Sequence, residues 1–94
     1  MIAQTILQQL GGGRFLAMTG AKYLLDLGNG IQFRLPKQAN KINSVRIVLN
    51  ADDTYDIEWF RIGRSLEVVK KHEGIYCDQL RELFEKTTGL FTSL

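Results

Sequence analysis

The stretch VRIVLNADDTYDIEWFRI, residues 45–62, decides the fold because it contains two strand patterns joined by one turn. Before the turn, apolar residues alternate with Arg46, and after it aromatic and aliphatic residues alternate with Asp56 and Glu58. Successive side chains of a strand point to opposite faces, so this alternation is typical of strands with one buried face. The link NADDT is too short for a parallel crossover, and the two strands are therefore predicted to pair antiparallel.

The second half of this stretch breaks the alternation after Trp59. We predict a β-bulge near Trp59 and Phe60, because one extra residue would return Phe60 and Ile62 to the core. In the link, Asp52 and Asp53 have side chains that can satisfy turn backbone groups. We therefore interpret them as turn residues rather than as a metal-binding pair.

The sequence before this stretch predicts a helix and further strands. Residues 3–10 place apolar side chains three and four positions apart, which indicates a short helix that Gly11 and the two glycines after it would stop. We interpret RFLAMT, residues 14–19, as a buried strand because it is a continuous apolar run. Residues 22–36, KYLLDLGNGIQFRLP, predict a hairpin with Asn29-Gly30 at its tip and Pro36 at its end.

The sequence after residue 62 predicts one more strand and a second helix. Gly63-Arg64 forms a tight turn, and the strand that begins at Leu66 is expected to run out in the polar segment KKHEG, residues 70–74, with His72 in a turn. Residues 75–88 have helical periodicity, with Tyr76 on the buried face and Gly89 as the C-terminal cap.

These elements predict an α+β fold in a single domain, residues 1–94. Short links between successive strands favour an antiparallel meander of five or six strands. The economical arrangement packs an N-terminal and a C-terminal helix on one face of that sheet.

The composition is that of an ordinary globular domain. The chain has 94 residues, of which 45% are hydrophobic and 23% charged, and its net charge of +2 is well short of the excess typical of a dedicated nucleic-acid binder. One cysteine excludes an internal disulfide, which is compatible with a reducing compartment. No signal peptide or membrane-spanning run is recognisable, so we expect a cytoplasmic protein without a membrane partner.

The sequence motifs that could form a phosphate-binding, catalytic or metal site lack the required residue spacing or the required number of residues. In GGGRFLAMTGAK, residues 11–22, Lys22 does not directly follow the last glycine, so the arrangement of a phosphate-binding loop is absent. His72 and Cys77 are the single residues of their kinds, which does not favour a catalytic pair or a zinc site. We predict no catalytic residues, no cofactor and no metal site, and hence no enzyme.

The open face of the predicted sheet is one candidate contact surface. An RNA-binding sheet combines basic side chains with an aromatic ring on which bases stack. The residues that could supply these groups are Lys22, Arg34, Arg46, Phe60 and Arg61. Because Asp56, Glu58 and Glu67 are expected on the same face, ordinary cross-strand charge pairing is favoured over a nucleic-acid platform.

The C-terminal segment GLFTSL is the second candidate surface. It places Leu90, Phe91 and Leu94 within five residues, too many apolar side chains for a mobile terminus. They either pack on the first helix of the same chain or form a patch that meets another subunit or a protein partner.

Three segments carry a resemblance to a known group of proteins. Residues 11–21 read Gly-Gly-x-Arg-Phe-x-Ala-Met-Thr-Gly-Ala, residues 74–80 read Gly-x-Tyr-x-Asp-x-Leu, and LNADDTYDIEW lies between them. Over essentially its whole length the chain resembles small proteins encoded by bacteriophages, prophages and other mobile elements of bacteria. The resemblance implies a genetic context but no activity. We therefore expect a non-catalytic accessory protein that acts by protein binding or self-association, with nucleic-acid binding through the open sheet face as the alternative.

Overall fold

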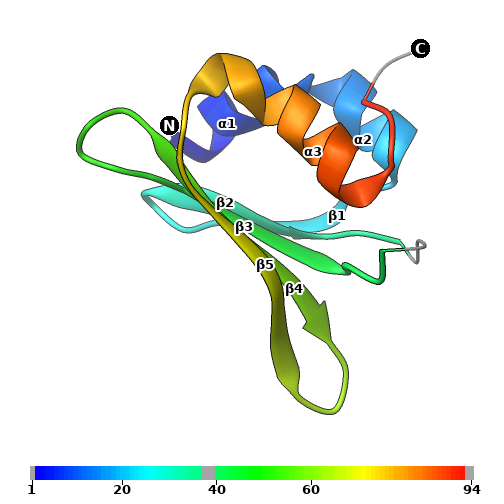
Figure 1. The fold of residues 1–94 in the computed structure, drawn as a ribbon. Helices are drawn as coiled ribbons and strands as arrows, with labels where there is room; N and C mark the ends of the chain where they lie inside the picture. The colour runs from blue at the N-terminus through cyan, green and yellow to red at the C-terminus, as the bar shows by residue number, and fades with distance from the viewer. Residues whose placement is uncertain (1, 37–39, 93–94) are drawn as a thin grey trace.

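The computed structural model describes residues 2–36 and 40–92, which form a five-stranded sheet covered by helices (Figure 1). The elements, in chain order, are α1 (Ile2–Leu10), α2 (Gly13–Thr19), β1 (Lys22–Asp26), β2 (Gly30–Arg34), β3 (Ser44–Leu49), β4 (Tyr55–Ile62), β5 (Leu66–Ile75), the 3₁₀ turn η1 (Cys77–Gln79) and α3 (Leu80–Thr88). The strands lie in the order β1-β2-β3-β4-β5 and every neighbouring pair is antiparallel. The predicted α+β meander with helices on one face is confirmed.

The core lies between the helices and one face of the sheet. Three phenylalanine rings meet at its centre, where Phe15 makes edge contacts with Phe33 and Phe84 at centroid distances of 5.5 and 5.0 Å. Trp59 is fully buried, with its ring 6.1 Å from that of Phe84. The predicted antiparallel pairing of residues 45–62 is confirmed, since Val45 lies opposite Trp59 and Ile47 opposite Ile57.

Residues 14–19 were expected to form a strand, and this prediction is wrong, because they lie in α2. Phe15 and Thr19, four residues apart, are its buried positions, and Gly20 adopts a left-handed C-cap with φ of 73°. A short apolar run has no periodicity of its own, so it does not distinguish a buried strand from one face of a short helix. Leu, Ala and Met also have high helix propensity.

The predicted β1–β2 hairpin is present, but its tip lies one residue earlier than expected. The amide of Leu27 donates to the carbonyl of Gly30 at 3.0 Å, so the two turn residues are Gly28 and Asn29, and Gly28 has a positive φ. Gly30 belongs to β2 and lies directly beside β3. A Cβ atom there would be 2.1 Å from the carbonyl oxygen of Ile47, so the close approach of these strands requires glycine.

The β4–β5 pair is longer than the sequence indicated. β5 continues through residues 70–74 to Ile75, so the prediction that the strand ends there, with His72 in a turn, is wrong. A register shift does lie between Trp59 and Phe60, but its extra residue is Val69 of β5, so the prediction that a bulge in this strand returns Phe60 to the face of Trp59 is wrong. Phe60 is buried on the sheet face opposite Trp59, because the β3–β4 register runs through it without interruption.

The C-terminal helix begins later than predicted. Ile75 still belongs to β5, η1 follows, and α3 starts at Leu80. Tyr76 is 60% exposed rather than on the buried face. The cap at Gly89 is confirmed, since it has φ of 78° and its amide donates to the carbonyl of Glu85. Within the described part of the chain, no helix combines the length and apolarity needed to cross a membrane.

Candidate functional site

The five residues proposed for nucleic-acid contact do not form one continuous surface. Arg46 and Phe60 share the open face, whereas Arg61, one residue after Phe60, lies on the other face of β4. Lys22 and Arg34 lie opposite each other at the β1 edge of the sheet. They line a cavity of about 280 Å³ together with Tyr23 and Pro36.

Two of these basic side chains already have acidic partners. Arg46 lies 3.7 Å from Glu58, donates to the side chain of Gln32, and holds its guanidinium 5.4 Å from the centre of the Phe60 ring. Arg61 pairs with Glu67. The Phe60 ring is only 4% exposed, so a nucleic-acid base could stack on it only if Arg46 moved.

The C-terminal segment is fixed to α3 as far as the structure describes it. Leu90 packs against the core, and Thr92 is fully buried, where its amide and hydroxyl donate to the Glu85 carboxylate. Phe91 is 70% exposed, and Leu94 lies outside the described residues. Of the predicted patch, Phe91 is therefore the one described residue that projects into solvent.

His72 and Cys77 have separate surroundings. The indole N–H of Trp59 donates to Nδ1 of His72 at 2.9 Å, so the neutral imidazole carries its proton on Nε2. Burial, and secondarily the nearby charge of Lys70, lowers the pKa of His72 below its ordinary value of 6.5. Cys77 is exposed in η1. Within residues 2–36 and 40–92, no group of three or more His, Cys, Asp or Glu side chains is placed to hold a metal ion.

Asp52 is a turn residue, as predicted. Its carboxylate accepts hydrogen bonds from the hydroxyl of Thr54 at 2.6 Å and from the amide of Thr54 at 3.3 Å. These bonds stabilise the ionised carboxylate and lower the pKa of Asp52 below its ordinary value of 3.8. The hydrogen bonds between Asp52 and Thr54 thus hold the turn that connects β3 to β4.

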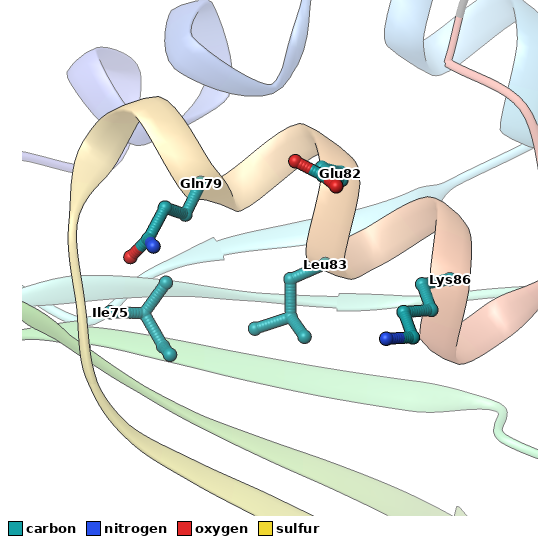
Figure 2. Close-up of a pocket in the computed structure, with 5 residues that line it drawn as sticks. All are labelled: Ile75, Gln79, Glu82, Leu83 and Lys86. Carbon is teal, nitrogen blue, oxygen red and sulfur yellow. The ribbon is translucent and has the colours of Figure 1, made fainter.

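A groove between β5 and α3 is lined by apolar, acidic and basic side chains. It begins as a cavity of about 210 Å³ that Figure 2 shows from the side, with Ile75 and Leu83 pointing into the same space. Gln79 lies toward one end and Lys86 toward the other, and Glu82 lies between them next to Leu83. Gln79 at the end of η1 and the three α3 residues of the lining stand at helical spacings of three and four, so they form one stripe that faces β5.

The groove continues past Lys86 along the same strand. A second cavity of about 330 Å³ shares Lys86 with the first and is lined also by Ile42, Val69 and Lys70. We call the two cavities together the β5–α3 groove. It has an apolar centre at Ile75 and Leu83, with the carboxylate of Glu82 next to Leu83, and two lysines at one end.

The outer edge of β5 borders this groove and has no neighbouring strand within the described residues. Val69, the extra residue at the bulge, is 43% exposed and lines the lysine end. Neither Lys70 nor Lys86 has an acidic group within salt-bridge distance in the described part of the chain. The edge therefore combines free backbone groups, apolar surface and unpaired positive charge.

The opposite edge of the sheet, strand β1, is exposed along its whole length. Tyr23 is 80% exposed and Leu25 54%. A register shift between Lys22 and Leu25 interrupts the pairing with β2, and Tyr23 has φ of 56°. Such a bulge twists the edge, which is one way in which proteins limit the addition of further strands.

Sequence reasoning missed the groove because it ended the last strand before His72. Two signals were available in the sequence. Ile75 is the first apolar residue after KKHEG, and the spacing of Gln79, Glu82, Leu83 and Lys86 marks a second helix stripe beside the fully buried one.

Comparison of the chain with protein-family models, with curated proteins and with solved structures finds no match. The resemblance to proteins of phages and mobile elements therefore stays a prediction.

Proposed function

We propose that the chain is a non-catalytic accessory protein of a phage or mobile element that acts in the cytoplasm by binding a segment of another protein. The binding site in this proposal is the β5–α3 groove. The observation that carries it is an unpaired edge strand beside a groove with an apolar centre. Peptides are recognised in this way when an extended segment pairs with an exposed sheet edge and places side chains in adjacent pockets.

The groove has the composition that such a site requires. Ile75 and Leu83 supply apolar surface that remains partly accessible although both pack against the core. Gln79 of η1 is held by the amide of Tyr76, which donates to its side-chain oxygen at 3.1 Å, and the backbone of Lys86 is held in α3. A peptide side chain inserted between them would bury apolar area, which is the main favourable contribution to association.

Selection from a displayed library of random dodecapeptides tests this function. We expect enriched peptides that bind the parent protein, lose binding to Leu83→Asp, and protect the β5 amides from hydrogen exchange. Tyr23→Asp, at the opposite edge, is the matched control and should bind as the parent does. Failure to enrich any peptide sensitive to Leu83→Asp would contradict the proposal, provided that the variant retains the circular dichroism spectrum of the parent.

Self-association through β1 is a second candidate, and the charge pattern of that strand favours it. Its sequence runs Lys22-Tyr23-Leu24-Leu25-Asp26. In a two-fold antiparallel pair centred on Leu24, Lys22 of each copy would face Asp26 of the other. The bulge at Tyr23 limits regular pairing, so we expect a weak dimer that forms only at high concentration.

Sedimentation velocity from micromolar to millimolar protein tests the dimer. We expect the Asp26→Lys variant to remain monomeric, because it places like charges opposite each other. The double variant with Lys22→Asp restores the opposite-charge pairs and should dimerise again. A monomer at every concentration of the parent protein would exclude this candidate.

Nucleic-acid binding is the alternative function, and the cavity beside Lys22 and Arg34 is the place where it could begin. Anisotropy of a labelled single-stranded oligonucleotide, measured over a range of salt concentrations, distinguishes it. Phosphate contacts make affinity fall steeply with salt. Salt-dependent binding lost in Arg34→Glu would replace the protein-binding proposal with this one.

A further inference from the structure

We infer that the β5–α3 groove selects an extended peptide carrying one aliphatic side chain and, on the same face, one carboxylate. This inference rests on the proposed function and adds the chemistry of the partner. The aliphatic side chain would enter at Ile75 and Leu83, and the carboxylate would lie between Lys70 and Lys86. The partner is thus an acidic, extended segment of another protein.

The apolar centre of the groove is the reason for expecting an aliphatic side chain in the peptide. Figure 2 shows Ile75 from β5 and Leu83 from α3 directed into one space, so that a side chain placed there would contact both. Glu82 lines the same cavity, and Gln79 closes its end nearest to η1. An acidic side chain at the apolar centre would be repelled by the neighbouring Glu82, whereas an aliphatic one would bury apolar surface.

Lys70 and Lys86 are the reason for expecting a carboxylate in the peptide. Both Lys70 and Lys86 line the far cavity, and neither has an acidic partner within the described residues. The adjacent Lys71 differs, because it lies 3.6 Å from Glu73 and opposite Glu58 on the open face. Two like charges on facing elements repel each other, and a carboxylate between them would relieve that repulsion.

The backbone of β5 favours an extended partner. Between its two register irregularities, residues 70–72 pair regularly with β4 and leave their outer edge unoccupied. A peptide strand can pair with this short stretch. Val69, which the bulge leaves without a counterpart on β4, adds apolar contact beside the lysines.

The geometry also sets the separation of the two side chains. Lys70 and Ile75 are five residues apart with one irregularity between them. The lysine end of the groove and its apolar centre are therefore separated by about four regular strand residues, or roughly 13 Å. We expect the carboxylate about four positions from the aliphatic residue, since residues an even number apart project to the same face.

Charge reversal on both partners tests the inference. A fluorescein-labelled dodecapeptide from the library selection, carrying Glu and Leu or Val at the expected spacing, is titrated against the parent and the Lys70→Glu/Lys86→Glu variant. We expect at least a tenfold loss of affinity in the variant. Replacement of the peptide's Glu by Lys should restore binding to the variant and abolish binding to the parent. The Lys22→Glu/Arg34→Glu variant at the opposite edge of the sheet changes the net charge by the same amount. It is the control for net charge and should change affinity less than twofold.

The outcomes separate this inference from the function on which it rests. If selected peptides depend on Leu83 but lack an acidic residue, or bind the charge-reversed variant as tightly as the parent, the inference is wrong while the groove remains a peptide site. If no selected peptide depends on the groove, both are wrong. Restored binding of the Lys-substituted peptide to the variant would support the inference, because a purely structural effect of the substitutions would not be rescued.

Discussion

The two edges of the sheet expose strands of different kinds. At one edge, β1 is five residues long, and its end charges are complementary to those of a second copy in antiparallel orientation. At the other, β5 is ten residues long and borders a groove with unpaired lysines at one end. An exposed edge strand therefore indicates the kind of partner only when the charges and cavities next to it are considered as well. The charges of β1 can be paired by β1 of a second copy. The groove beside β5 instead has side-chain pockets and lysines whose charge only a different, acidic partner would neutralise.

The largest effect should come from removing the side chain that supports the β5 side. Trp59 is fully buried between α3 and the sheet and donates its indole N–H to His72 of β5. Truncation of Trp59 to alanine is therefore expected to lower the free energy of unfolding by about 3–5 kcal/mol, measured by urea denaturation. A melting temperature within a degree or two of the parent would mean that Trp59 does not anchor this edge.

A smaller but still substantial effect is expected on the β1 side from Gly30→Ala. Its new methyl group would collide with the backbone of Ile47 and push the β1–β2 hairpin away from β3. Overpacking of this kind costs about 1–3 kcal/mol, measurable by urea denaturation. Gly13→Ala is the control, because nothing lies within 4 Å of a Cβ there, and it should be neutral or slightly stabilising. Equal stability of the two variants would show that β2 and β3 can separate without cost.

The pKa of His72, lowered by burial and by the nearby charge of Lys70, predicts a pH dependence of the free energy of unfolding. Because the pKa of His72 is lowered in the folded state, the unfolded chain takes up this proton at a higher pH than the folded one does. The stabilisation is complete above about pH 6.5 and declines as the pH falls below that value. Trp59 fluorescence during urea denaturation reports it. A His72→Asn variant can still accept from the indole but does not titrate, so its stability should be flat between pH 7 and pH 5.

The smallest effects are expected at the exposed edge positions themselves. Leu24→Lys in β1 and Val69→Lys in β5 lie on partly exposed surface, so each should change the free energy of unfolding by less than about 1 kcal/mol. Their functional effects should differ. Leu24→Lys should abolish dimerisation in sedimentation velocity, and Val69→Lys should leave it unchanged. A dimer disrupted by Val69→Lys instead would move self-association to the β5 edge.

How much could be predicted from the sequence depended on periodicity. The alternation around Val45 to Trp59 fixed the central antiparallel pair, and the helical stripe of α1 is buried at Ala3, Ile6 and Leu10 as expected. RFLAMT has no periodicity, and its interpretation failed because packing against Phe33 and Phe84, which are distant in sequence, selects the helix. The second half of β5 was not predicted because its residues are mostly hydrophilic. An edge strand that is exposed to water on its outer side and on much of one face needs few apolar residues.

The candidate site was less accessible to prediction than the fold. Residues of the groove come from β5, α3 and the segment after Asn40, and only the folded chain brings them together. The sequence did identify Leu90 and Phe91 as unusual for a terminus. It could not show that Leu90 is partly buried against the core whereas Phe91 is exposed, because the segment is held by hydrogen bonds of Thr92 to Glu85 that only the folded chain forms.

The position of Cys77 has a practical consequence for spectroscopy. The chain contains one tryptophan and one cysteine, and the exposed thiol lies in η1, two residues before Gln79 at the end of the groove. A thiol-reactive dye can therefore be attached at a unique site without any substitution. Trp59 beneath β5 is then a unique energy donor for that acceptor. The natural sequence thus provides a donor–acceptor pair whose energy transfer would report movement of η1 relative to the core when the groove is filled.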